Sequence, residues 1–207
     1  MSYIGSKPAN KPVVASDLDP TVITGQTALA TSPADTDEFL ISDAGVLKRL
    51  DASLIGGGKI GQVLSTTKQD TWSSSGTGSF QAVTGLSVAI TPSAASSKIY
   101  VNVDLTGYFN DYGGGFSIYR GGSAIVAPTS PSSRSIVNAG QHTTGAAYTS
   151  AFGHSYLDSP SSTSELTYQV YVFARTGIYY INRSKTDSDT NDYVRAVSTI
   201  TAFEVLA

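Results

Sequence analysis

The sequence predicts an all-β protein, and three features of its composition and pattern carry that prediction. Thr and Tyr, which favour strands, number 23 and 12 among the 207 residues, while Ser and Gly, which favour turns, number 30 and 20. From residue 60 onward, short alternating segments recur between Gly, Ser, Asn and Asp residues, which is typical of a β-sandwich or barrel. The 40% of hydrophobic residues can form a core, so the composition is not that of a disordered chain.

Residues 1–36 are predicted to be an extended arm. They contain four of the eight prolines, which disfavour helix interiors and central strands, and too few apolar residues for a closed core. A disordered tail is one interpretation. The other is an arm that becomes ordered on a partner, since a purely solvating tail would carry more charge. In the second case the anchoring residues are Tyr3, Ile4, Val13, Val14, Leu18, Val22 and Ile23.

Residues 37–50 are predicted to form a β-hairpin. Two apolar-rich segments flank Asp43-Ala44-Gly45, which is a turn signal. Phe39 and Ile41 share one face and Leu40 lies on the other, so neither face is cleanly polar. An isolated hairpin is marginally stable in water, and we expect copies of the same chain to supply the missing neighbours.

Three successive glycines at 56–58 predict a hinge. They divide a hairpin shaft, residues 37–58, from the C-terminal sandwich, residues 59–207. Alternating apolar and polar residues mark the expected strands of this sandwich. These strands are residues 86–90, 99–106, a segment starting at Phe116, and residues 148–157, 166–173, 178–182 and 194–206.

The last of these strands is uncharged on both faces except for Arg195 and Glu204. A strand with two dry faces must be covered twice, once by the opposing sheet and once by another layer. We expect a second copy of the chain to be that layer. A long loop of the same chain is the alternative.

Composition also excludes several kinds of function. Without cysteine, the chain has no disulfide framework, cysteine-based zinc site, iron–sulfur cluster or thiol nucleophile. A net charge of −3 argues against a nucleic-acid partner. No apolar run approaches the ~20 residues of a membrane span, and residues 1–7 lack the apolar stretch of a signal peptide. We therefore expect no cofactor, no nucleic acid and no membrane insertion.

Enzymatic chemistry has little support in the residues. His142 and His154 are the only histidines, and no G-x-S-x-G sequence supplies a serine nucleophile. Glycoside hydrolysis needs two carboxylates across a cleft, and nothing in the sequence pairs the carboxylates present. Those considered are Glu38, Glu165, Glu204, Asp104, Asp111 and Asp158. We expect a protein that is not an enzyme.

The acidic segment 187–192 partly matches a calcium-binding loop. Oxygen ligands alternate through Asp187 and Asp189, but Asp192 stands where such a loop needs glycine and Ser198 where it needs glutamate. We expect a solvated acidic turn without metal. The nearby Asn182-Arg183-Ser184 matches a glycosylation sequon, to which we assign no function.

Two loops are candidate binding surfaces. Residues 106–113 place aromatic rings among Gly, Asn and Asp, a combination suited to sugar rings and protein epitopes. Residues 128–144 form a long irregular stretch of the kind that is more often functional than idle. The alternatives are aromatic residues that fill the sandwich or a subunit interface, and a mobile loop with no ligand. The candidate residues are Tyr108, Phe109, Asn110, Asp111, Tyr112, Arg134, Gln141 and His142.

Short motifs along nearly the whole chain carry a resemblance to a known family. They are MSYIGSKPA at 1–9, DEFLISDAGVL at 37–47, and residues 84–88, 90–93, 97–99, 157–160, 182–184 and 197–200. In this order they resemble the short fibre proteins of tailed bacteriophages, especially marine phages. Each motif is structural rather than catalytic.

The resemblance implies a homotrimer with a jelly-roll-like, antiparallel β-sandwich head. The arm would bind other virion tail proteins, and the head would contact a host surface glycan or outer-membrane protein. Such a fibre is assembled in the bacterial host cytoplasm and acts on the virion. A purely structural virion protein, such as a head fibre, connector or decoration protein, is the alternative.

Overall fold

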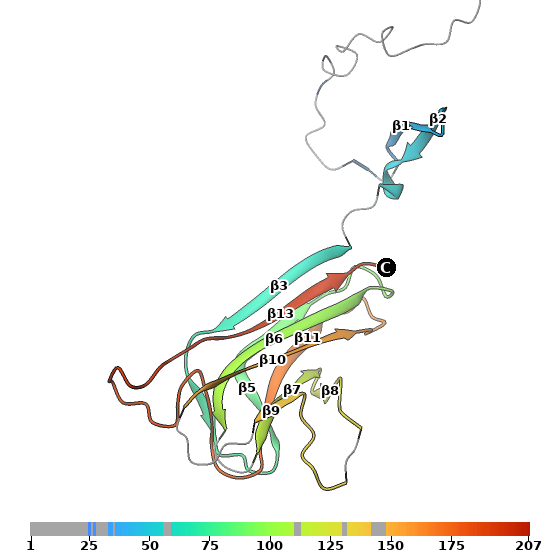
Figure 1. The fold of residues 1–207 in the computed structure, drawn as a ribbon. Coiled ribbons are helices and arrows are strands. Elements are labelled where there is room, and N and C mark those ends of the chain that lie inside the picture. The colour runs from blue at the N-terminus through green and yellow to red at the C-terminus, as the bar shows by residue number, and fades with distance from the viewer. Residues whose placement is uncertain are drawn as a thin grey trace, which may run out of the picture. The chain divides into compact units, whose positions relative to one another are not determined.

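The fold is described from a computed structural model of the 207-residue chain (Figure 1). The structure describes residues 25, 27, 33–34, 36–55, 59–109, 113–129, 132–141 and 148–207. All seven anchoring candidates of the arm lie outside these residues. The chain divides into two compact units, Met1–Gly56 and Gly57–Ala207, and each is described by itself.

The described part of the first unit is the predicted hairpin. β1 (Glu38–Asp43) pairs antiparallel with β2 (Val46–Asp51). The turn residues Ala44 and Gly45 have φ angles of 49° and 82°, the conformation that a two-residue hairpin loop requires. A 3₁₀ helix, η2 (Ala52–Leu54), follows, and the Asp51 side chain caps it by accepting a hydrogen bond of 3.0 Å from the Ser53 backbone N–H.

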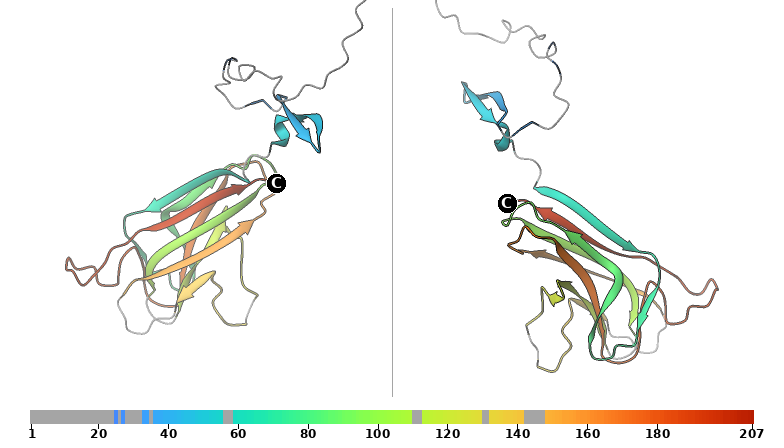
Figure 2. Two further views of the ribbon diagram at one scale, coloured as in Figure 1. Left: turned by 45° about the horizontal axis from the view of Figure 1, so that its top comes forward. Right: turned by 180° about the vertical axis from the view of Figure 1, so that it is seen from behind.

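The second unit consists of two antiparallel sheets that face one another (Figures 1 and 2). The six-stranded sheet contains β3 (Ile60–Lys68), β4 (Trp72–Ser74), β6 (Lys98–Phe109), β10 (Ser150–Asp158), β12 (Tyr179–Ile181) and β13 (Ser198–Val205). The five-stranded sheet contains β5 (Phe80–Ile90), β7 (Gly114–Arg120), β8 (Ser123–Ala124), β9 (Ala139–Gln141) and β11 (Leu166–Ala174).

The strand order is that of a jelly roll. In the six-stranded sheet, β6 pairs with β13 along one edge and with β10 along the other, giving the order β3-β13-β6-β10. In the five-stranded sheet the order is β5-β11-β7-β9. Consecutive strands of the chain therefore alternate between the sheets at most steps, as in a sandwich of two Greek keys. β4 and β12 extend the first sheet beyond the ends of β3 and β13.

A single core fills the space between the sheets because β5, β6, β7, β11 and β13 turn apolar side chains inward. The predicted strand 99–106 does this most regularly, since Ile99, Val101, Val103 and Leu105 are all at most 1% exposed. Opposite them lie buried side chains of the other sheet. These include Val83, Leu86, Val88, Ile90, Phe116, Ile118, Tyr168, Val170 and Val172.

Several strand boundaries differ from the predictions. β5 begins at Phe80 rather than residue 86, and β13 begins at Ser198 rather than residue 194. Residues 182–197 instead form a long loop, anchored at its base by a β-bridge between Arg183 and Arg195. β3 went unpredicted because it is an edge strand with only Lys68 buried, so its sequence lacks clear alternation. β9 lies inside the stretch that was expected to be irregular.

Candidate functional site

Two of the three aromatic residues predicted to contact a receptor are buried in the structure. Tyr108 and Phe109 end β6 and are 1% and 2% exposed. The Phe109 ring packs against Phe152, with ring centroids 5.2 Å apart, and Tyr108 packs against Tyr180 at 6.1 Å. β6 extends to residue 109 and pairs there with β12. Phe109 belongs to the core between the sheets, whereas Tyr108, on the opposite face of the strand, is buried beside Tyr180. Their burial within one chain fits the alternative, that these aromatic residues belong to the fold.

The remaining receptor candidates do not form a described site. Asn110, Asp111, Tyr112 and His142 lie outside the described residues. Gln141 ends β9, where its backbone pairs with Gly114. Arg134 is exposed in the loop before β9, and within the described chain no hydrogen bond or ion pair joins it to another residue.

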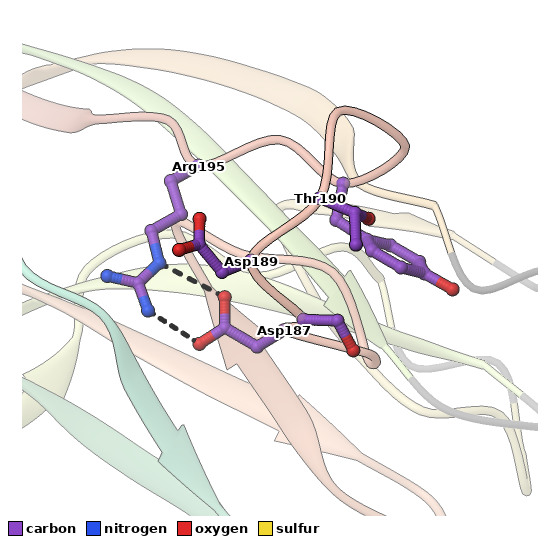
Figure 3. Close-up of a pocket in the computed structure, with 6 residues that line it drawn as sticks. Asp187, Asp189, Thr190 and Arg195 are labelled. Atoms are coloured by element: carbon purple, nitrogen blue, oxygen red, sulfur yellow. Dashed lines mark hydrogen bonds and ion pairs between the residues drawn. The ribbon is translucent and has the colours of Figure 1, made fainter.

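The structure shows a pocket in the loop between β12 and β13 (Figure 3). Its volume is about 520 Å³. One continuous segment supplies all of its lining, and the sequence had singled out part of this segment as an acidic turn. The lining residues are Asp187, Ser188, Asp189, Thr190, Tyr193 and Arg195.

Asn182 anchors this loop at its base. Its side chain is 0% exposed, and its φ of 61° is a left-handed conformation that asparagine tolerates. The Asn182 amide donates to the backbone carbonyls of Lys68 and Asp70 at 2.8 and 2.9 Å. Its carbonyl oxygen accepts from the Ser198 hydroxyl at 2.6 Å. One side chain therefore ties the start of the loop to β3 and to the start of β13.

Asp187 fixes the middle of the loop. Arg195 donates two hydrogen bonds to its carboxylate, 3.0 Å from Nε and 2.8 Å from Nη2 (Figure 3). Arg183 donates a third, at 3.3 Å. The hydrogen bonding from Arg195, helped by the charge of Arg183, lowers the pKa of Asp187. This two-pronged pairing sets the shape of the loop.

Other polar groups of the pocket are free to meet a ligand. Among the described residues, no hydrogen bond or ion pair occupies the Asp189 carboxylate or the side-chain hydroxyls of Thr190 and Tyr193. Tyr193 is half-buried, while Asp189 and Thr190 are exposed. Figure 3 shows Asp189 beside the pair formed by Asp187 and Arg195. The pocket thus combines an aromatic ring, a free carboxylate and a guanidinium group.

This arrangement is poorly suited to calcium. Two arginines already occupy the Asp187 carboxylate, and their positive charges oppose a cation there. In the part of the chain that the structure describes, no three His, Cys, Asp or Glu residues gather closely enough to hold a metal ion.

Two carboxylates considered for glycoside hydrolysis have structural partners. Glu204 is 0% exposed and accepts hydrogen bonds from the Ser93 backbone N–H and hydroxyl and from the Gln62 amide. Burial opposes its ionisation, but these hydrogen bonds outweigh burial and lower the pKa of Glu204 to about 2. Asp158 is 6% exposed and pairs with Arg120. Neither lies free at a cleft.

The outer face of the six-stranded sheet is a second candidate surface. The strand register places Val63, Phe203, Tyr100 and Leu157 side by side across β3, β13, β6 and β10. We call these four residues the apolar row. Val63, Tyr100 and Leu157 are 53%, 38% and 45% exposed, and Phe203 is half-buried against Tyr100.

The two registers beyond the apolar row are polar but almost without charge. They contain Ser65, Thr201, Asn102 and Ser155, then Thr67, Thr199, Asp104 and Gly153. Hydroxyl pairs such as Ser65 with Thr201, 3.0 Å apart, satisfy one another. The outer face of β13 is therefore uncharged, as predicted, and in a single chain it remains partly open.

Comparison with known proteins adds no relative. No known protein family and no curated protein matches this chain. The described residues contain no helix long and apolar enough to cross a bilayer.

The sequence alone missed the pocket's aromatic and cationic members, Tyr193 and Arg195. Its only signal there was the alternation of acidic residues, which suggested a metal rather than a mixed pocket. The sequence predicted no role for Asn182. Its position directly after a short strand was the signal that it could anchor the loop that follows.

Proposed function

We propose that this protein is a bacteriophage tail fibre, a homotrimeric virion appendage whose C-terminal head recognises the host cell surface. The arm would attach it to other virion tail proteins. The observation that carries the proposal is the set of apolar side chains that one copy of the chain leaves exposed, both on the hairpin and on the outer face of the six-stranded sheet.

The hairpin exposes apolar side chains on both faces. Phe39 and Leu40, on opposite faces, are 40% and 73% exposed, and Val46, Leu54 and Ile55 are exposed as well. Two strands of six residues cannot bury this surface by themselves. Packing against the same segment of other copies would cover both faces and would protect the hairpin edges from pairing with other proteins.

The apolar row fits the same occupant, a second copy of the chain. The neighbouring residues on this face carry two charges of opposite sign, Lys98 and Asp104, so two like faces can meet without a net repulsion.

The head's fold agrees with this proposal without proving it. Jelly rolls occur in viral capsid and lectin domains, but a fold does not determine a function. Three identical weak sites on one trimer would raise the effective affinity for a cell surface without any new contact.

A purely structural virion protein is the alternative, and the burial of Tyr108 and Phe109 favours it because it removes two receptor candidates. Adsorption of the purified, labelled full chain to host cells and to resistant cells separates the two. Saturable binding to host cells alone is expected. Equal, non-saturable binding to both would refute receptor recognition.

A further inference from the structure

We infer that the pocket of the β12–β13 loop binds a neutral saccharide. The inference rests on the proposed function and deepens it, since it names the class of ligand and the residues that would bind it. It rests on the geometry of the residues that line this pocket, and not on the two loops, 106–113 and 128–144, that the sequence predicted to bind a receptor.

The pocket is preorganised. Its base is fixed by Asn182, and its wall is fixed by the two hydrogen bonds from Arg195 to Asp187. The Ser188 carbonyl accepts from the Thr190 N–H at 2.9 Å, and the Thr190 carbonyl from the Tyr193 N–H at 3.3 Å. A loop already held in shape loses less conformational freedom when a ligand binds.

The groups that remain free match a pyranose ring. Tyr193 offers an amphipathic ring for the apolar face of a sugar. The unpaired Asp189 carboxylate can accept hydrogen bonds from two neighbouring sugar hydroxyls. Arg195 uses Nε and Nη2 on Asp187, so the N–H groups of its third nitrogen remain for a sugar oxygen. The volume of about 520 Å³ accommodates a small ligand of this size.

Charge selects against acidic sugars. The charges around the pocket balance, with Arg183 and Arg195 against Asp187 and Asp189, so an anion gains no net attraction there. Both arginines pair with Asp187, which leaves the Asp189 carboxylate as the group without an ion pair of its own. A uronic acid carboxylate would be repelled by Asp189, whereas neutral hydroxyls would donate to it. We therefore expect neutral hexosides to bind better than their acidic counterparts.

The test is a ligand-observed NMR titration of the full chain with methyl glucoside, methyl galactoside, methyl mannoside and methyl glucuronide. At least one neutral glycoside is expected to bind, with glucuronide weaker. Asp189→Asn and Tyr193→Ala should each weaken binding about tenfold or more, because each removes a principal contact. Asp192→Asn is the matched control, since Asp192 is exposed in the same loop but does not line the pocket.

No binding of any neutral glycoside would overturn the inference, as would equal losses in Asp189→Asn and Asp192→Asn, or tighter binding of glucuronide. Light scattering on the same samples keeps the two proposals apart. A trimer that binds no glycoside overturns this inference alone, and a monomer that binds one overturns the proposed assembly alone. Thermal unfolding of each variant establishes that the fold is retained.

Discussion

At the scale of single residues, two buried polar side chains hold loops to the sandwich. Asn182 bridges the β12–β13 loop to β3, and Glu204 binds the β5–β6 connection through Ser93. Buried polar groups are tolerable only when they are hydrogen-bonded, and both residues are. Removing either side chain should therefore lower the free energy of unfolding, and each side chain fixes the conformation of the loop that it binds.

Asn182→Ala should lower the free energy of unfolding by about 2–4 kcal/mol. The substitution leaves the carbonyls of Lys68 and Asp70 and the hydroxyl of Ser198 without this partner. Chemical denaturation measures the effect, with the exposed Asn191→Ala in the same loop as the control. Equal stability of the two variants would show that Asn182 does not anchor the loop.

The lowered pKa of Glu204 predicts that its contribution to the free energy of unfolding depends on pH. Its pKa in the folded protein is about 2, against 4.5 ordinarily, so its contribution is fully present above pH 4.5 and is lost as the pH falls toward 2. At neutral pH, Glu204→Gln should cost about 1–2 kcal/mol, and the difference from the original protein should shrink across this acidic range. Glu165→Gln, at an exposed position, should show no such trend in the same denaturation series.

At the scale of elements, the strands that line the core followed from the sequence, whereas the edge strand β3 and the short strands β4 and β9 did not. Regular alternation predicted β6 and β11, whose inward residues form the core. β4 and β9 have three residues each, too few for a periodic pattern, and only tertiary pairing defines them. The sequence could not show that Tyr108 and Phe109 continue β6, because a Gly- and Asn-rich context also fits a loop.

The pairing of β7 with β9 depends on glycine at position 115. A Cβ added there would clash with the backbone carbonyl of Ala139 and lie 2.8 Å from the Gly140 Cα. Gly115→Ala should therefore destabilise the protein by about 1–3 kcal/mol. Gly153→Ala in β10 is the control, since its Cβ would meet only ordinary contacts at 3.6 Å or more. Unchanged thermal stability of Gly115→Ala would contradict this packing.

At the scale of the whole molecule, the account depends on how much apolar surface one chain leaves exposed. Patterning predicted an uncharged outer face of β13, and the register adds that its apolar members align across four strands. That alignment was beyond the sequence because β3 has no clear alternation of its own. The pocket also could not be predicted from the sequence, since the conformation of its loop depends on Asn182 and on two arginines that flank the acidic segment and pair with Asp187.

Disrupting the apolar row should weaken association between copies. Tyr100→Lys places a charge in the middle of the row, where a like face would have to bury it at considerable cost. Ser123→Lys, exposed on the other sheet, is the matched control. Sedimentation of both variants should show a shift toward smaller species for Tyr100→Lys only. The same distribution for both would exclude this face from the interface.

The most direct measurement is the molar mass of the purified full chain by light scattering over a wide range of dilution. We expect three times the 21.5 kDa of one chain at every concentration at which the hairpin is folded. A folded species of 21.5 kDa throughout would mean that one chain tolerates its exposed apolar surfaces alone, and the proposal of a trimeric fibre would be wrong.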